Sequence, residues 1–245
     1  MNLVWTWLGD PANWQGYDGI PTRIAEHLAY SAVTLLLAAL IGIPLGLWIG
    51  HTGNGRVVVV NLVNGMRSVP TLGLLFVAVL VVGPLLAGDV AFLVPSIFVL
   101  VVLAVPPIMA GAYAGVEGVD PGARDAARGM GMRPAQVLVR VELPCALPLI
   151  FGGLRSAALQ VVATATLAAS VSLGGLGRFL IDGQAYRDYG QMAAGALLVA
   201  ALAMAVDLVF AAVQRLVVSP GLGAPRTTQR SPGRGLAART GAFAS

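Results

Sequence analysis

Lysine is absent from this chain, and charged residues of either sign are scarce. All 15 basic residues are arginine, and charged residues make up 11% of the 245 residues, whereas soluble domains carry about 25%. So little charge cannot cover a globular surface, but helices that face lipid need none. The missing lysine also excludes a phosphate-binding loop of the Gly-x-x-x-x-Gly-Lys-Ser/Thr type, so any use of ATP requires a separate subunit.

Reactive and metal-binding side chains are equally few. A single Cys145 excludes an intrachain disulfide and a cysteine-based zinc site. His27 and His51 are the only histidines, and we expect both to be interfacial residues rather than bases or ligands. The sequence therefore predicts no enzyme activity, cofactor or metal. The arginines do not gather on a soluble face, which argues against nucleic-acid binding.

What the chain has in abundance is apolar sequence, with 57% hydrophobic residues and a mean hydropathy of +0.83. Long apolar runs of this kind predict an all-α, polytopic transmembrane helical bundle. We expect five spans, at about Leu28–Gly50, Val57–Ala87, Val90–Val116, Leu147–Leu173 and Tyr189–Val218. Splitting the second or third run would give six.

The second run is too long for one straight crossing, since about 20 residues suffice. It is interrupted at Arg67-Ser-Val-Pro70, where proline removes a backbone donor. We expect a short first piece and a longer crossing piece. Broken helices at membrane depth need a polar or protein-lined environment, so Ser68, Pro70 and Thr71 are candidate residues of a translocation pathway.

Arginines are distributed unevenly between the two ends of the predicted spans. One side carries Arg56, Arg124, Arg128, Arg133, Arg140, Arg215, Arg226, Arg230, Arg234 and Arg239. The other carries Arg23, Arg178 and Arg187. The positive-inside rule places the first group in the cytoplasm, with the N-terminus outside and the C-terminus inside. A sixth span would move the N-terminus inside.

Three segments follow from these patterns. Residues 1–26 are an extracytoplasmic or interfacial segment rich in tryptophan. Residues 27–218 form the transmembrane domain. Residues 219–245 carry four arginines without apolar periodicity, so we expect a disordered cytoplasmic tail that could contact lipid headgroups.

Two charges fall inside predicted spans, Arg155 in the fourth and Asp207 in the fifth. Ionisable groups in membrane spans are costly and are usually paired or functional. The two spans run in opposite directions, which brings both residues to the cytoplasmic half of the membrane. We therefore predict an Arg155–Asp207 ion pair, and a proton relay is the competing role.

A polar stretch at about 120–141 interrupts the apolar runs on the cytoplasmic side. Asp120-Pro121 fits a helix N-cap followed by proline at the first helical position, and Gly131 can end that helix in the left-handed conformation. On the helix, Ala123, Ala127 and Met130 are expected to share one face, with Asp125 close enough to pair with Arg128. We expect a second helix from Pro134 to Val141 and a bend at Pro144.

This stretch resembles the EAA motif of permease subunits from bacterial ABC importers, which is Glu-Ala-Ala, three residues, Gly, nine residues, Ile-x-Leu-Pro. Asp125 stands for Glu, Ala126, Ala127 and Gly131 match, Val141 stands for Ile, and Leu143-Pro144 match. The resemblance extends over about residues 20–222. It includes Arg67-Ser-Val-Pro70 and Leu173-Gly-Gly-Leu-Gly177, and is strongest to the osmoprotectant class.

The resemblance implies a function and a set of partners. The function is a non-catalytic permease subunit of an importer for glycine betaine, choline, carnitine or proline-type solutes in a bacterial plasma membrane. Cytoplasmic ATPase subunits, a second permease copy or paralogue and an extracytoplasmic substrate-binding protein are the expected partners. The motif implies a coupling helix that docks on the ATPase through Asp125, Ala126, Ala127, Arg128, Gly131 and Met132.

Other interpretations remain at this point. Permeases for methionine share several of these features. A stand-alone secondary transporter or channel would have internal repeats or several intramembrane acids, and the sequence has one strong acid candidate. A membrane scaffold that transports nothing would leave the EAA spacing unexplained.

Overall fold

A computed structural model of the protein describes residues 2–218, and every regular element within them is helical. The α-helices are α1 (Asn2–Gly9), α2 (Ile20–Thr52), α3 (Arg56–Arg67), α4 (Thr71–Val82), α5 (Val90–Glu117), α6 (Pro121–Gly129), α7 (Pro134–Val137), α8 (Leu143–Ala168), α9 (Gly177–Tyr186) and α10 (Tyr189–Val217). The predicted all-α helical bundle is confirmed. The predicted tail, residues 219–245, lies outside the described residues.

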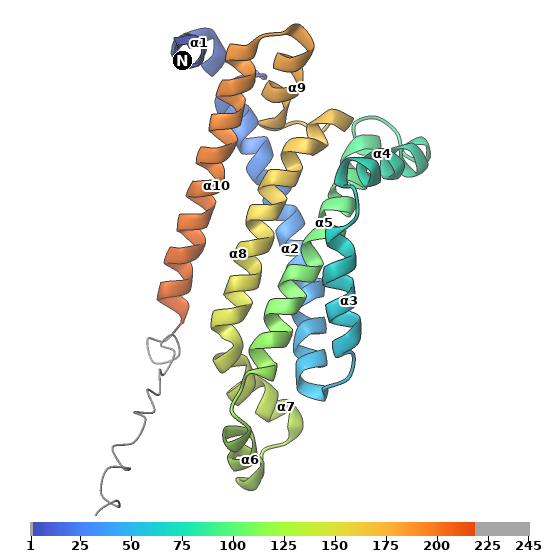
Figure 1. Ribbon diagram of the computed structural model, residues 1–245, viewed down its shortest axis with the longest axis vertical. Coiled ribbons are helices and arrows are strands. Elements are labelled where there is room, and N and C mark those ends of the chain that lie inside the picture. Colours follow the sequence, from blue (N-terminus) through green and yellow to red (C-terminus); the bar gives the residue numbers. More distant parts are fainter. Residues whose placement is uncertain (1, 219–245) are drawn as a thin grey trace, which may run out of the picture.

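Within the described residues, four helices are long and apolar enough to cross a membrane. They are α2, α5, α10 and the continuous helix Pro134–Val171, which contains α7 and α8. Figure 1 shows α2, α5 and α8 side by side, with α10 at the edge of the bundle. No residue in the most apolar stretch of α10 is buried, so this helix presents its surface to the surroundings of the chain.

The second expected span, Val57–Ala87, is divided between two helices. α3 ends at Arg67 and α4 begins at Thr71, so the predicted break at Arg67–Pro70 is confirmed. The second piece is the longer one, as expected, because α4 continues through a 3-10 turn (Gly83–Leu85) to give an apolar helix over Thr71–Leu85. It is too short to cross the membrane as predicted, at about 23 Å of helix against about 30 Å of hydrocarbon. α4 lies across the end of α5 that is remote from α6 (Figure 1).

The helix after α6 also differs from expectation. The bend predicted at Pro144 is wrong, because α7 continues through a π-helical turn, Leu138–Glu142, into α8. Pro144 has no N–H to donate, and the Leu143 N–H reaches back to the Leu138 carbonyl. The wider turn accommodates the proline without ending the helix.

The N-terminal segment is more ordered than its mixed composition indicates. After α1, a short 3-10 turn at Pro11–Trp14 is capped by Asp10, and α2 begins at Ile20, well before the expected Leu28. Trp7 packs edge-on against Phe179 of α9, with ring centroids 5.2 Å apart. α1 and α9 therefore form one end of the molecule, opposite α6 (Figure 1).

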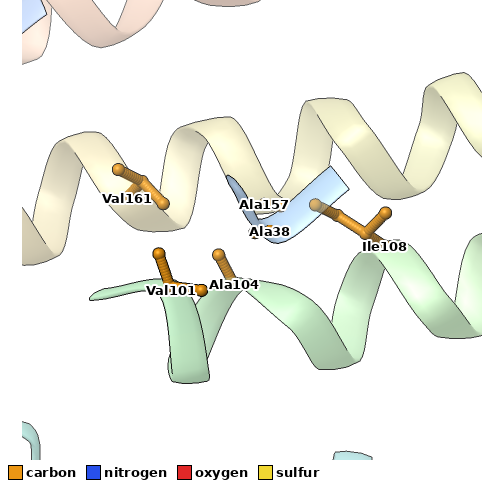
Figure 2. Close-up of a cluster of buried hydrophobic side chains, with 6 residues drawn as sticks. All are labelled: Ala38, Val101, Ala104, Ile108, Ala157 and Val161. Atoms are coloured by element: carbon orange, nitrogen blue, oxygen red, sulfur yellow. The ribbon is translucent and has the colours of Figure 1, made fainter. Parts of the chain in front are cut away.

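Apolar side chains from three spans meet in the centre of the bundle. Figure 2 shows Ala157 and Val161 of α8 facing Val101, Ala104 and Ile108 of α5, with Ala38 of α2 beside them. All six residues are buried. Their small and β-branched side chains allow α2, α5 and α8 to approach closely.

Glycines set the distance between these helices. A Cβ atom on Gly46 of α2 would lie 2.5 Å from the carbonyl oxygen of Met109 and 2.6 Å from Cβ of Ala112. A Cβ atom on Gly153 of α8 would lie 2.8 Å from the carbonyl oxygen of Pro107. Helices in lipid gain little hydrophobic attraction for one another, so close backbone packing of this kind holds them together.

Candidate functional site

α6 is a short helix with well-defined ends. The Asp120 side chain accepts a hydrogen bond of 3.2 Å from the Gly122 N–H, and Pro121 occupies the first turn. The helix stops at Met130, and Gly131 follows with φ +80°. The cap at Asp120 and the left-handed Gly131 are therefore confirmed. Figure 1 places α6 beyond the ends of α5 and α8, at the tip of the molecule.

The outer face of α6 carries most of the residues that the sequence singles out for docking. Asp125 and Arg128 are exposed and form an ion pair of 3.7 Å, as expected. Ala126 and Gly131 are exposed and Met132 is half-buried. Ala127, by contrast, is 1% exposed, so it packs α6 against the protein and is not available to a partner.

Met130 departs from the expected face. Its side chain is 72% exposed while Ala127 is buried, so the prediction that the two share a face with Ala123 is wrong. The reason is that Met130 caps the helix with φ −79° and ψ 7°, where helical spacing no longer applies. A large apolar side chain therefore stands free at the tip, next to Gly131.

Behind α6 lies a buried carboxylate. Glu142, in the π-helical turn, is 1% exposed. Its Oε2 lies 2.6 Å from Nδ1 of His51 at the end of α2, and its Oε1 lies 3.0 Å from Nε of Arg124 on α6. His27, towards the other end of α2, is 1% exposed, with Nε2 3.1 Å from the Val162 carbonyl oxygen, so the protein encloses this side chain.

The structure brings Arg155 of α8 and Asp207 of α10 together. Nε of Arg155 donates to Oδ1 of Asp207 at 2.5 Å, and Nη2 donates to Oδ2 at 2.6 Å. The two parallel bonds give the fork-to-fork geometry of a strong guanidinium–carboxylate pair. Their side chains are 40% and 27% exposed, so the pair lies at the surface of the single chain.

A polar recess lies where α5 contains two adjacent prolines. Pro107 has no N–H for the carbonyl of Leu103 four residues earlier, and Nε2 of Gln160 on α8 donates to that carbonyl instead, at 3.2 Å. A cavity of about 260 Å³ adjoins this contact, and it is lined by Met66, Leu103, Pro106, Pro107, Ala110, Ser156 and Gln160.

The predicted pathway residues Ser68, Pro70 and Thr71 lie at the break between α3 and α4. Oγ of Ser68 donates to the Gly65 carbonyl at 2.7 Å, which closes the end of α3. None of the three is among the described residues that line the recess, but Met66, at the end of α3, lines it. The break and the recess are thus neighbouring features.

Residues 42–219 match a family of membrane proteins, the inner membrane components of binding-protein-dependent transport systems. The chain belongs to this permease family. The match covers the spans from the middle of α2 to the end of α10, including α6. Together with the four apolar helices, it makes this permease a multi-pass protein of a bacterial plasma membrane.

Named relatives of the permease are transport proteins. It is 31% identical over 199 residues to the choline transport system permease protein OpuBB of Bacillus subtilis, covering 80% of this chain and 88% of the relative. It is also 31% identical over 202 residues to a glycine betaine/carnitine/choline permease protein, OpuCB, of the same organism, covering 82% and 89%.

Among solved structures, the permease is similar to a chain of the MetNI methionine ABC transporter in an inward-facing conformation. The TM-score is 0.67 at 25% identity, over 82% of the permease and 96% of that chain. The fold and the sequence thus agree on an ABC transporter permease.

Two features of the permease escape sequence reasoning. Glu142 looks like an ordinary residue of the motif, because its partner His51 is 91 positions away. Gln160 looks like an isolated polar residue in a span. The one signal in the sequence is Pro107, which has no N–H and so leaves the Leu103 carbonyl free to accept from Gln160.

Proposed function

We propose that this chain is the membrane-spanning subunit of an ATP-driven importer for compatible solutes of the glycine betaine, choline, carnitine or proline betaine type. The relatives named for choline and for glycine betaine, carnitine and choline support the solute class. The observation that carries the transport role is α6, a capped helix at the tip of the molecule with an exposed polar face.

We infer that α6 is the coupling helix and docks on a cytoplasmic ATPase subunit. Asp125, Ala126, Arg128 and Gly131 offer small and charged groups on the outer face, and Met132 lies at its edge. Ala127 contributes by fixing the helix from behind. The chain has no lysine, so it cannot build a phosphate-binding loop of its own, and hydrolysis falls to the partner. The permease itself is non-catalytic.

The end of the bundle that carries α6 is the cytoplasmic one in this proposal. Among the described residues it carries Arg56, Arg124, Arg128, Arg133, Arg140 and Arg215, while the opposite end carries Arg23, Arg178 and Arg187. The positive-inside rule favours this orientation. α1 then lies outside the cell and α10 ends inside it, and an extracytoplasmic binding protein would deliver solute at the end of α1 and α9.

The pathway in this proposal passes the break at Ser68–Thr71 and the recess beside Gln160. Irregular backbone and unsatisfied carbonyls are tolerated at membrane depth only where protein or water covers them. The exposed polar side chains of Ser156 and Gln160, one turn apart on α8, face away from the core of the single chain. A second permease copy or a close paralogue would close the pathway from that side.

A methionine permease is the second candidate, and the similarity to the MetNI transporter favours it. Uptake separates the two. The permease, its ATPase and its binding protein are expressed in cells that lack their own uptake systems, and labelled glycine betaine, choline and methionine are supplied at low and high osmolarity. The proposal expects uptake of glycine betaine or choline, and uptake of methionine alone would contradict it.

A further inference from the structure

Glu142 and its partner Arg124 together connect four elements at the inner end of the bundle. Glu142 belongs to the π-helical turn before α8, His51 to the last turn of α2, and Arg124 to α6. Arg124 also donates from Nη2 to the carbonyl of Val116 at the end of α5. A carboxylate at 1% exposure is stable only when it has partners, and here the two partners come from different helices.

Few other contacts attach α6 to α2 and α5. It packs mainly against α7 and the π-helical turn, and Ala127 is its one buried residue among those described. Arg124 therefore connects α6 directly to α5, through the Val116 carbonyl, and indirectly to α2, through Glu142 and His51.

The π-helical turn accounts for the position of Glu142. A π turn inserts one extra residue and rotates the side chains that follow. The Leu143 N–H bonds to the Leu138 carbonyl across this turn, and Pro144 leaves no α-helical alternative at the next position. The local sequence thus directs Glu142 inward, towards His51 on α2 and Arg124 on α6.

We propose that His51, Glu142 and Arg124 form a rigid polar link that transmits movement of α6 to the inner ends of α2 and α5. Glu142 is then a positioning residue for coupling. The inference builds on the proposed docking of an ATPase at α6. A cavity of about 330 Å³ lined by His51, Tyr113, Glu117 and Arg124, among others, adjoins the link and gives the inner ends of α2 and α5 space in which to shift.

A distance measurement on the full-length permease alone tests the link without relying on the ATPase. Spin labels are attached to Ala126→Cys on α6 and Trp48→Cys on α2, with Cys145→Ser to remove the native thiol. We expect one narrow distance distribution, which Glu142→Gln and Arg124→Gln broaden. The control Asp182→Asn breaks an ion pair of 2.8 Å with Arg178 on α9 and should change nothing. Unchanged distributions in both Glu142→Gln and Arg124→Gln would overturn the link.

The assembled transporter in proteoliposomes supplies the second readout. Glu142→Gln and Arg124→Gln should retain the ATPase but lower the solute transported per ATP hydrolysed by about tenfold. Arg124 lies at the partly exposed edge of the cluster, so Arg124→Gln can be used for this measurement if Glu142→Gln does not fold. Unchanged transport per ATP in the folded variants would overturn the inference. An ATPase that fails to bind even the unsubstituted permease would instead contradict the proposed docking, and the spin-label distances would still decide the link.

Discussion

Arg155 and Asp207 join α8 to α10 through two parallel hydrogen bonds of 2.5 and 2.6 Å. No residue in the most apolar stretch of α10 is buried. The pair is therefore a specific, directional tie between α8 and a helix whose most apolar stretch is unburied.

Exchanging the two charges tests this role. Arg155→Gln and Asp207→Asn should each lower the thermal unfolding midpoint of the purified permease, because each leaves one unpaired charge at membrane depth. The exchange Arg155→Asp with Asp207→Arg should recover much of the loss. If the unfolding midpoint of the double variant is no higher than those of the single variants, the pair does not fix α10.

Gly46 should tolerate no side chain. Gly46→Ala places a methyl group 2.5 Å from the Met109 carbonyl oxygen, and overpacking of this kind costs about 1–3 kcal/mol. The matched control is Gly152→Ala on α8, where a Cβ atom meets nothing within 4 Å and alanine favours the helix. Thermal unfolding in detergent should separate the two variants, and equal midpoints would contradict the packing argument.

Gln160 should matter for transport. Gln160→Leu removes the donor to the Leu103 carbonyl and replaces a polar wall of the recess with an apolar one. We expect a raised KM for solute uptake at normal expression. Gln214→Leu is the control, because Gln214 donates to the Pro148 carbonyl at 3.4 Å outside the recess. Uptake that is equally affected by both variants would count against a pathway at the recess.

Gly131 and Gly129 differ in backbone conformation. Gly131 has φ +80°, whereas Gly129 is helical, and a Cβ atom on either residue would meet nothing within 4 Å. Gly131→Ala should strain the turn by about 1 kcal/mol and weaken ATPase association, while Gly129→Ala should leave it unchanged. Pull-down at increasing salt measures the association of the ATPase with each variant. Equal association of Gly131→Ala and Gly129→Ala would mean that the left-handed turn is not needed for docking.

Local signals in the sequence predicted a good part of this structure. The Asp120 cap, the left-handed Gly131 and the break before Pro70 each depend on a residue whose backbone chemistry is decisive by itself. The length of α4 was not predicted, because its short apolar stretch fits a crossing helix as well as a surface one. α9 was not predicted, because its ten residues mix polar and apolar side chains. The Glu142 cluster depends on a contact across 91 positions, which no local pattern contains.

The proposed docking site for an ATPase is α6. The direct measurement is co-purification of the ATPase subunit with the full-length permease and with Gly131→Arg, after membrane insertion of both has been verified. Gly131 is exposed at the tip, so arginine there should leave the spans intact and abolish association. Retained association of Gly131→Arg with the ATPase would contradict the account.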